Sequence, residues 1–144
     1  MGRLAVVALL VAALTACGGG GRLSRDDYVK RADAICAKYN RRIRALRQPR
    51  TIAGISAFTA KAIPIARRGD DELRALEPPK GDEATARTWL AADDAVVGAI
   101  ERLGAAARRS DRAGIRKALR EGRRANERSK RLARRLGLRV CSRG

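Results

Sequence analysis

The chain has 144 residues and no histidine, and its 33 basic against 15 acidic side chains give a formal net charge of +18. Without histidine it lacks the usual general base, the usual zinc and haem ligand and the usual pH switch, so ordinary hydrolase triads are excluded. Aromatic residues make up only 3% of the chain, and its alanine- and leucine-rich apolar set favours packed helices over strands.

Residues 1–16 have the pattern of a secretory signal peptide. Arg3 precedes an apolar run from Leu4 to Leu14, which is too short to span a bilayer because a spanning helix needs about 20 residues. The run leads into Leu14-Thr15-Ala16-Cys17, which resembles the bacterial lipobox, whose cysteine thiol receives diacylglycerol. We therefore predict a lipoprotein acylated at Cys17 and anchored on the extracytoplasmic face of the cell membrane. An ordinary signal peptide with an incidental cysteine is the alternative.

Residues 17–23 are predicted to be the lipidated cysteine and a glycine-rich tether. Two acyl chains anchor a protein stably where one chain does not. The four glycines at 18–21 have no side chains to pack and would keep a folded domain a short distance from the lipid. They do not resemble a phosphate loop, because no strand precedes them and no Lys-Ser/Thr pair follows. The folded domain is predicted to cover residues 24–144.

The first two helical segments are expected at 24–47 and 52–76. The first begins at Ser24 in the style of a capping box, with acidic residues in its first turn. The second contains Pro64, which cannot donate a hydrogen bond to the carbonyl of Ala60. A kink at Pro64 is therefore expected, with two shorter helices as the alternative.

The last two helical segments follow a Pro-Pro loop and a short turn. The third begins after Asp82 and Glu83, whose negative charge suits the N-terminus of a helix. The fourth begins at an N-cap, Asp111, and ends at Gly137. Because all connections are short, the chain is predicted to be all-α, an antiparallel up-down-up-down four-helix bundle. The expected inward-facing residues are Tyr28, Ala32, Ile35, Tyr39, Ile43, Leu46, Ile52, Ile55, Phe58, Ala62, Ile65, Leu73, Leu76, Trp89, Val96, Ile100, Leu103, Ile115, Leu119, Gly122, Ala125, Ser129, Leu132 and Leu136.

Cys36 and Cys141 are the two cysteines that remain once Cys17 is acylated. In an oxidising compartment such a pair normally forms a disulfide. Cys36 would lie about 16 Å into the first helix, and residues 138–141 can reach back about 13 Å from the end of the fourth. We predict a disulfide that staples the C-terminal tail to the first helix. The alternative, a redox-active or metal-binding pair, lacks a CxxC spacing, a histidine and a third free thiol.

The positive charge is concentrated near the C-terminus, where residues 108–144 contain 15 basic and 3 acidic side chains. At about 100° per residue, the basic side chains of the fourth helix fill one arc of about 160° opposite its apolar stripe. We predict that this arc binds anionic phospholipid or anionic wall polymer, and a solvated face in a genome that favours arginine codons is the alternative. Nucleic acid is not an expected partner, because no aromatic residues are interleaved with the charges. The arc, here called the arginine face, contains Arg112, Arg116, Arg120, Arg123, Arg124, Arg128, Arg131, Arg134 and Arg135.

Carboxylates occur as neighbours at 70–72, 82–83 and 93–94. This is not the Glu-x-x-His pattern of a di-iron bundle, so neither a metal nor a cofactor is expected. Asp93 and Asp94 straddle the edge of the apolar stripe of the third helix, which makes one of them a candidate buried functional carboxylate. No set of residues supplies a nucleophile with its base, so no catalytic residue is predicted and an enzyme is not expected.

Several short motifs resemble those of small uncharacterised lipoproteins of actinobacterial type. They are Ala32-Asp33-Ala34-Ile35-Cys36 with Asn40, the segments 62–65 and 76–79, and Leu136-Gly137-Leu138-Arg139-Val140-Cys141. The resemblance implies a helical fold with Cys36 paired to Cys141, and it carries no activity. Asp33 and Asn40 flank Cys36. We expect these two residues to lie on the helix surface or to cap the tail, and a polar site is the alternative.

These features favour a non-enzymatic, membrane-anchored envelope lipoprotein that binds or scaffolds at the membrane surface through the arginine face. A second hypothesis is a small-ligand-binding or sensing module, with the ligand between helices near Trp89 or at Pro64.

Overall fold

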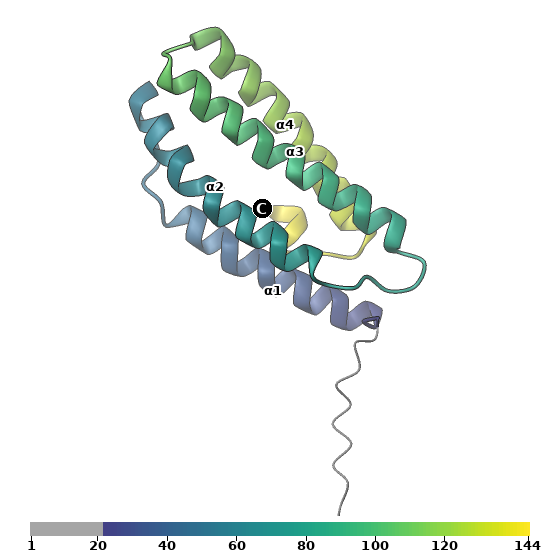
Figure 1. Ribbon diagram of the computed structural model, residues 1–144. Helices are drawn as coiled ribbons and strands as arrows, with labels where there is room; N and C mark the ends of the chain where they lie inside the picture. Colours follow the sequence, from purple (N-terminus) through teal and green to yellow (C-terminus); the bar gives the residue numbers. More distant parts are fainter. Residues whose placement is uncertain (1–21) are drawn as a thin grey trace, which may run out of the picture.

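The computed structural model describes residues 22–144, which form four α-helices and a C-terminal 3₁₀ turn (Figure 1). The helices are α1 (Arg25–Arg44), α2 (Ile52–Arg74), α3 (Glu83–Arg108) and α4 (Arg112–Arg135), and the turn is η1 (Cys141–Arg143). Each helix packs on the next along the chain, so the predicted antiparallel four-helix bundle is confirmed. Within residues 22–144, no helix combines the length and apolarity that a membrane span needs. The predicted signal peptide, Cys17 and the four glycines lie outside the described residues.

Local sequence signals set most of the helix ends. The side chains of Ser24 and Asp111 each accept a hydrogen bond from the backbone N–H three residues ahead, at 3.1 and 2.8 Å. Gly137 has a φ of 81° and ends α4 in a Schellman motif, in which the N–H of Leu138 donates to the carbonyl of Ala133 at 2.9 Å. The predicted caps at these three positions are therefore confirmed.

Helix α2 runs as one element through Pro64, so the alternative of two shorter helices is wrong. Proline removes one backbone hydrogen bond, and packing of α2 between α1 and α3 holds the helix together across it. Helix α1 ends at Arg44, three residues before the predicted end, and α2 ends at Arg74. Each helix ends shortly before a loop that contains proline, at Pro49 and Pro78. Proline disfavours helical backbone at the residue that precedes it.

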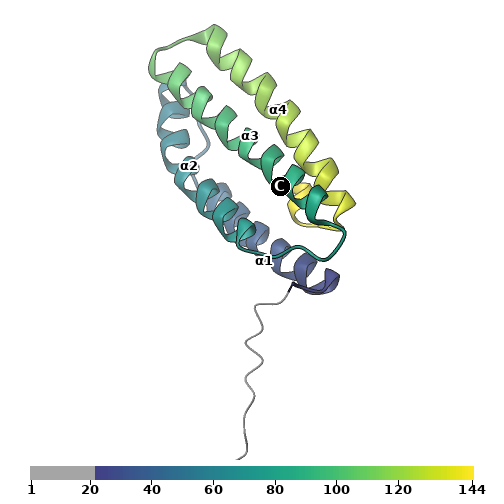
Figure 2. The same cartoon turned by 45° about the vertical axis from the view of Figure 1, so that its right-hand side comes forward.

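Helix α3 packs against both α2 and α4 and lies between them in Figure 2. Trp89 and Tyr28 are the largest fully buried side chains of the core, and Thr59 is 0% exposed. Thr59 lies directly against Gly104, where an added Cβ would overlap its hydroxyl. The prediction that Leu119 faces inward is wrong, because its side chain is 42% exposed. Among the helices only α3 packs against α4, so the flank of α4 that carries Leu119 stays uncovered.

The C-terminal tail closes the bundle between α1 and α4. No Cα atom of α1 lies within 8 Å of one in α4, whereas the tail contacts both helices, and both views show it between them (Figures 1 and 2). Leu138 is 1% exposed and packs in a cluster with Tyr28 and Ala32. Cys141 is bonded to Cys36, with their Cα atoms 5.3 Å apart. The predicted staple is confirmed.

Asp33 holds the same tail by its backbone. Its carboxylate accepts hydrogen bonds from the N–H groups of Arg139, Val140 and Cys141 at 2.9, 2.8 and 3.1 Å. Because α1 presents this carboxylate one turn from Cys36, the non-covalent and covalent attachments act on the same short segment. The expected tail-capping role is confirmed for Asp33.

Candidate functional site

The arginine face lies entirely in solvent. All nine of its arginines are exposed, and among the described residues none of them forms an ion pair. Of the acidic residues of α4, Glu121 pairs with Arg102 of α3 at 3.0 Å and so lies toward that helix. Glu127 is exposed within the arc and forms no ion pair with these arginines, so the face is strongly cationic with one acidic residue in it.

The C-terminal end of this face lies at the end of the bundle where the described chain begins. Arg25, in the first turn of α1, donates to the backbone carbonyl of Arg135 at 3.4 Å. The same side chain approaches Asp82 at the start of α3, at 3.5 Å, and Figure 1 shows α1, α3 and the end of α4 converging there. The last turns of the arginine face therefore lie beside the first turn of α1.

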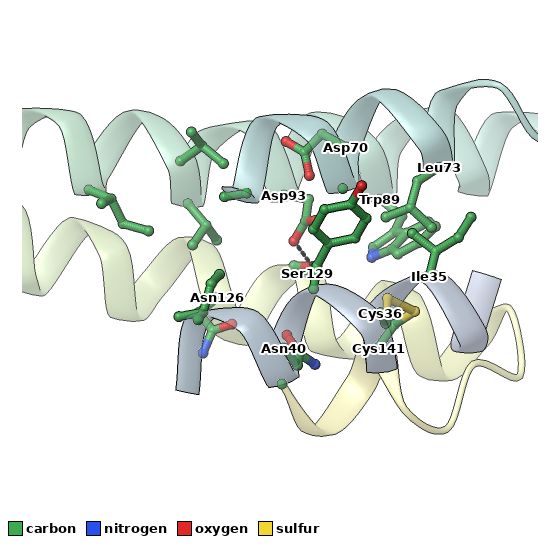
Figure 3. Close-up of a pocket in the computed structure, with 18 residues that line it drawn as sticks. Ile35, Cys36, Asn40, Asp70, Leu73, Trp89, Asp93, Asn126, Ser129 and Cys141 are labelled. Atoms are coloured by element: carbon green, nitrogen blue, oxygen red, sulfur yellow. Dashed lines mark hydrogen bonds between the residues drawn. A yellow bond between two sulfur atoms is a disulfide. The ribbon is translucent and has the colours of Figure 1, made fainter. Parts of the chain in front are cut away.

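A separate cavity of about 240 Å³ lies inside the bundle, behind the disulfide (Figure 3). All four helices and the tail contribute to its wall. Trp89 lies at one end with Ile35 and Leu73, and the Cys36–Cys141 bond forms part of the side toward the tail. A shallower hollow on α3 and α4 adjoins the cavity, and the two share Val96, Ile100, Asn126 and Gly144.

Two carboxyl groups from different helices meet in this cavity. Asp70 of α2 is 5% exposed, and Asp93 of α3 is half-buried. The two carboxyl groups lie close enough for each to affect the pKa of the other. Ser129 of α4, 3% exposed, donates to Asp93 at 3.1 Å (Figure 3). Three helices thus each contribute one polar group to a single point of an otherwise apolar interior.

The surroundings of the two carboxyl groups raise the pKa of both. Burial, followed by the charge of Asp93, raises the pKa of Asp70 from 3.8 to about 7. Burial also raises the pKa of Asp93, against the hydrogen bonds from Asp70 and Ser129, which lower it. The carboxyl group of Asp70 therefore gains or loses its proton near neutral pH.

Trp89 adds an unsatisfied donor to the same cavity. Its side chain is 1% exposed, and its indole Nε1–H is buried with no hydrogen-bond partner among the described residues. In Figure 3 this nitrogen lies at the end of the ring nearer to Asp93 and Ser129. A buried donor without a partner costs about 1–3 kcal/mol, and a hydrogen-bond acceptor inside the cavity would remove that cost.

Sequence reasoning located this site only in part. It named Asp93 or Asp94 as a candidate buried carboxylate, and the structure selects Asp93, because Asp94 turns outward to Arg74 at 3.4 Å. It placed a possible ligand near Trp89, where the cavity is found, or at Pro64, which is exposed and does not line it. Asp70 was missed. The available signal was its position three residues before Leu73 on the apolar stripe of α2.

Among residues 22–144, no three histidine, cysteine, aspartate or glutamate side chains gather in a way that could hold a metal ion. Comparison of the chain with protein-family models, with curated proteins and with solved structures finds no match.

Proposed function

We propose that this protein is a lipid-anchored, non-enzymatic component of the cell envelope that binds an anionic surface through the arginine face. The observation that carries the proposal is the exposure of all nine arginines without an acidic partner. An unneutralised cationic stripe attracts anionic headgroups or polymer, and each basic residue near such a surface contributes about 1 kcal/mol. Acylation at Cys17 on the extracytoplasmic side would hold the stripe at that surface.

The length of the stripe suggests how the domain would lie. Arg112 and Arg135 are the first and last residues of α4, and a helix of 24 residues is about 36 Å long. At physiological ionic strength, salt screens exposed charges that are more than about 8 Å apart. The stripe is several times longer than this distance. A domain that lies with α4 along the surface engages the whole stripe, whereas an upright domain engages only the end near the tether.

The test uses residues 18–144, which contain the four helices and the disulfide but lack the acylated cysteine. We expect this fragment to sediment with vesicles that contain phosphatidylglycerol and not with vesicles of phosphatidylcholine, and we expect added salt to release it. Equal binding to both vesicles at low salt would contradict the proposal. Cys17→Ser in the full chain should abolish metabolic lipid labelling and leave an association with membranes that added salt releases.

Matched triple variants separate the arginine face from total charge. Replacement of Arg112, Arg116 and Arg120 by glutamine, or of Arg131, Arg134 and Arg135, should each weaken vesicle binding at least tenfold. This estimate follows from about 1 kcal/mol for each removed charge. The control replaces three exposed arginines of α1, Arg31, Arg41 and Arg44, and loses the same charge. If the control weakens binding equally, net charge and not the arginine face is responsible.

A further inference from the structure

The interior cavity is acidic in a protein whose net charge is +18. Neither Asp70 nor Asp93 forms an ion pair with a described basic side chain. The neighbouring cation, Arg74, acts on both electrostatically but places its guanidinium against Asp94 and Asp71. Buried carboxyl groups without a cation are costly, and apolar residues would fill the same space at no such cost. A positively charged ligand would stabilise the pair, and no described basic side chain forms an ion pair with it.

The remainder of the cavity is suited to a small apolar body. Its walls include Ile35, Leu73, Val97 and Ile100, with the ring of Trp89 at one end. The volume of about 240 Å³ exceeds the roughly 150 Å³ in which an engineered apolar cavity binds benzene. A ligand with one six-membered ring and a short chain fits this space.

We propose that the cavity binds a small organic ammonium ion, with its ammonium group on the carboxyls of Asp70 and Asp93 and its apolar body against Trp89. A hydrogen-bond acceptor on the ligand, such as a hydroxyl oxygen, would satisfy the Nε1–H of Trp89. This site goes beyond the anionic-surface binding proposed above, because it takes a ligand of opposite charge in the interior of the bundle. The ligand would enter from the side where the cavity adjoins the hollow on α3 and α4.

Binding of an ammonium ion is expected to displace the proton that the carboxyl pair holds. The groups that act on the pair are Arg67 and Arg74 of α2, Asp94 of α3 and Ser129 of α4, and Tyr39 of α1 lines the same cavity. Affinity for an amine should therefore rise between pH 5 and 8 as the pair ionises, with a proton released to solvent.

The experiment is a calorimetric titration of the full acylated protein in non-ionic detergent micelles with three probes of similar size. Tyramine carries the ammonium, the ring and the hydroxyl, phenethylamine lacks the hydroxyl, and 3-(4-hydroxyphenyl)propionate carries a carboxylate in place of the ammonium. We expect saturable one-site binding of tyramine, weaker binding of phenethylamine and none of the propionate. Fluorescence of Trp89, the single tryptophan of the chain, should change on tyramine binding.

Variants assign the binding to the cavity. Asp70→Asn and Asp93→Asn should each weaken tyramine binding at least tenfold and remove its pH dependence. Asp71→Asn, at an adjacent position whose side chain is 78% exposed, is the matched control and should leave both unchanged. Trp89→Phe should abolish the preference for tyramine over phenethylamine, because it removes the Nε1–H that would donate a hydrogen bond to the hydroxyl oxygen.

Each of the following results would overturn the proposal. They are the absence of binding by both amines up to millimolar concentration, equal binding of the propionate, and equal loss of affinity in Asp70→Asn and Asp71→Asn. Circular dichroism of each variant shows whether it is folded. A folded Asp70→Asn protein that binds tyramine as the parent does would show that the amine binds elsewhere, most simply to the micelle. Vesicle binding through the arginine face does not depend on these outcomes.

Discussion

The backbone N–H of Cys141 donates to the carboxylate of Asp33 at 3.1 Å, one turn of α1 from the disulfide partner Cys36. Asp33→Ala removes the acceptor for this bond and for two neighbouring N–H groups. Hydrogen bonds to charged groups contribute about 1.5–3 kcal/mol each. In the variant, water can accept hydrogen bonds from the freed N–H groups and recovers part of this energy. We expect a loss of about 2 kcal/mol in the free energy of unfolding, measured with urea. Asp26→Ala, at an exposed position of the same helix, should cost less than about 1 kcal/mol.

The disulfide constrains the unfolded chain over 105 residues of sequence separation. In the chain-entropy model a loop of this length contributes about 4.7 kcal/mol. We expect the Cys36→Ser/Cys141→Ser double variant to lose about this amount in urea unfolding, and the reduced parent protein to behave in the same way. A titration of free thiols under non-reducing conditions in residues 18–144 should find none, and one free thiol or more would refute the pairing in the cell.

Gly104 is required because Thr59 of α2 occupies the space where its Cβ would lie. Gly104→Ala should destabilise the protein by about 1–3 kcal/mol through overpacking, and Thr59→Ala in the same chain should recover part of the loss. The control is Gly98→Ala, on the same helix, where the added Cβ meets only the end of the Arg102 side chain at 3.4 Å. That change should stabilise α3 by about 0.5–1 kcal/mol because alanine is the better helix former, and thermal unfolding would measure both effects.

The raised pKa of Asp70 predicts a specific dependence of stability on pH. Its pKa is about 7 in the folded protein against 3.8 for the ordinary group, so the folded state holds the proton more tightly. The stability gained from this proton is complete below about pH 4 and is lost as the pH rises through about 7. Urea unfolding at several pH values should show this loss, at about 1.4 kcal/mol per unit of pKa difference, and Asp70→Asn should remove it.

Other carboxylates act in the opposite direction, so the comparison of variants is decisive. Hydrogen bonds from Lys38 and Tyr39 lower the pKa of Glu72, which adds stability as the pH rises through the acid range. Subtracting the profile of Asp70→Asn from that of the parent isolates the contribution of the pair. A difference that does not change between pH 4 and pH 7 would contradict the raised pKa.

Features fixed by neighbouring residues were predictable from the sequence, and features fixed by helix packing were not. Ser24, Asp111 and Gly137 cap their helices through backbone contacts within five residues, so their patterns are visible in the chain. Pairing of Cys36 with Cys141 followed from compartment and from the reach of the tail.

The contact between Asp70 and Asp93 depends on how α2 and α3 are rotated about their axes, to which many residues contribute at once. In a run of acidic residues each successive side chain turns by about 100°, and the sequence does not show which one enters the core. The exposure of Leu119 has the same origin, because the apolar stripe of α4 is wider than the surface that α3 covers.

The staple also has a mechanical consequence. Residues 37–140 lie inside the covalent loop closed by Cys36 and Cys141, so they include all of α2, α3 and α4. A force applied between a membrane anchor at the N-terminus and the end of the tail would pass through the sulfur–sulfur bond and bypass the three enclosed helices. Only the part of α1 before Cys36 could then be pulled out. Under such a load Tyr28 and Ala32, which precede Cys36, could be drawn out of the core, while α2, α3 and α4 would carry no tension.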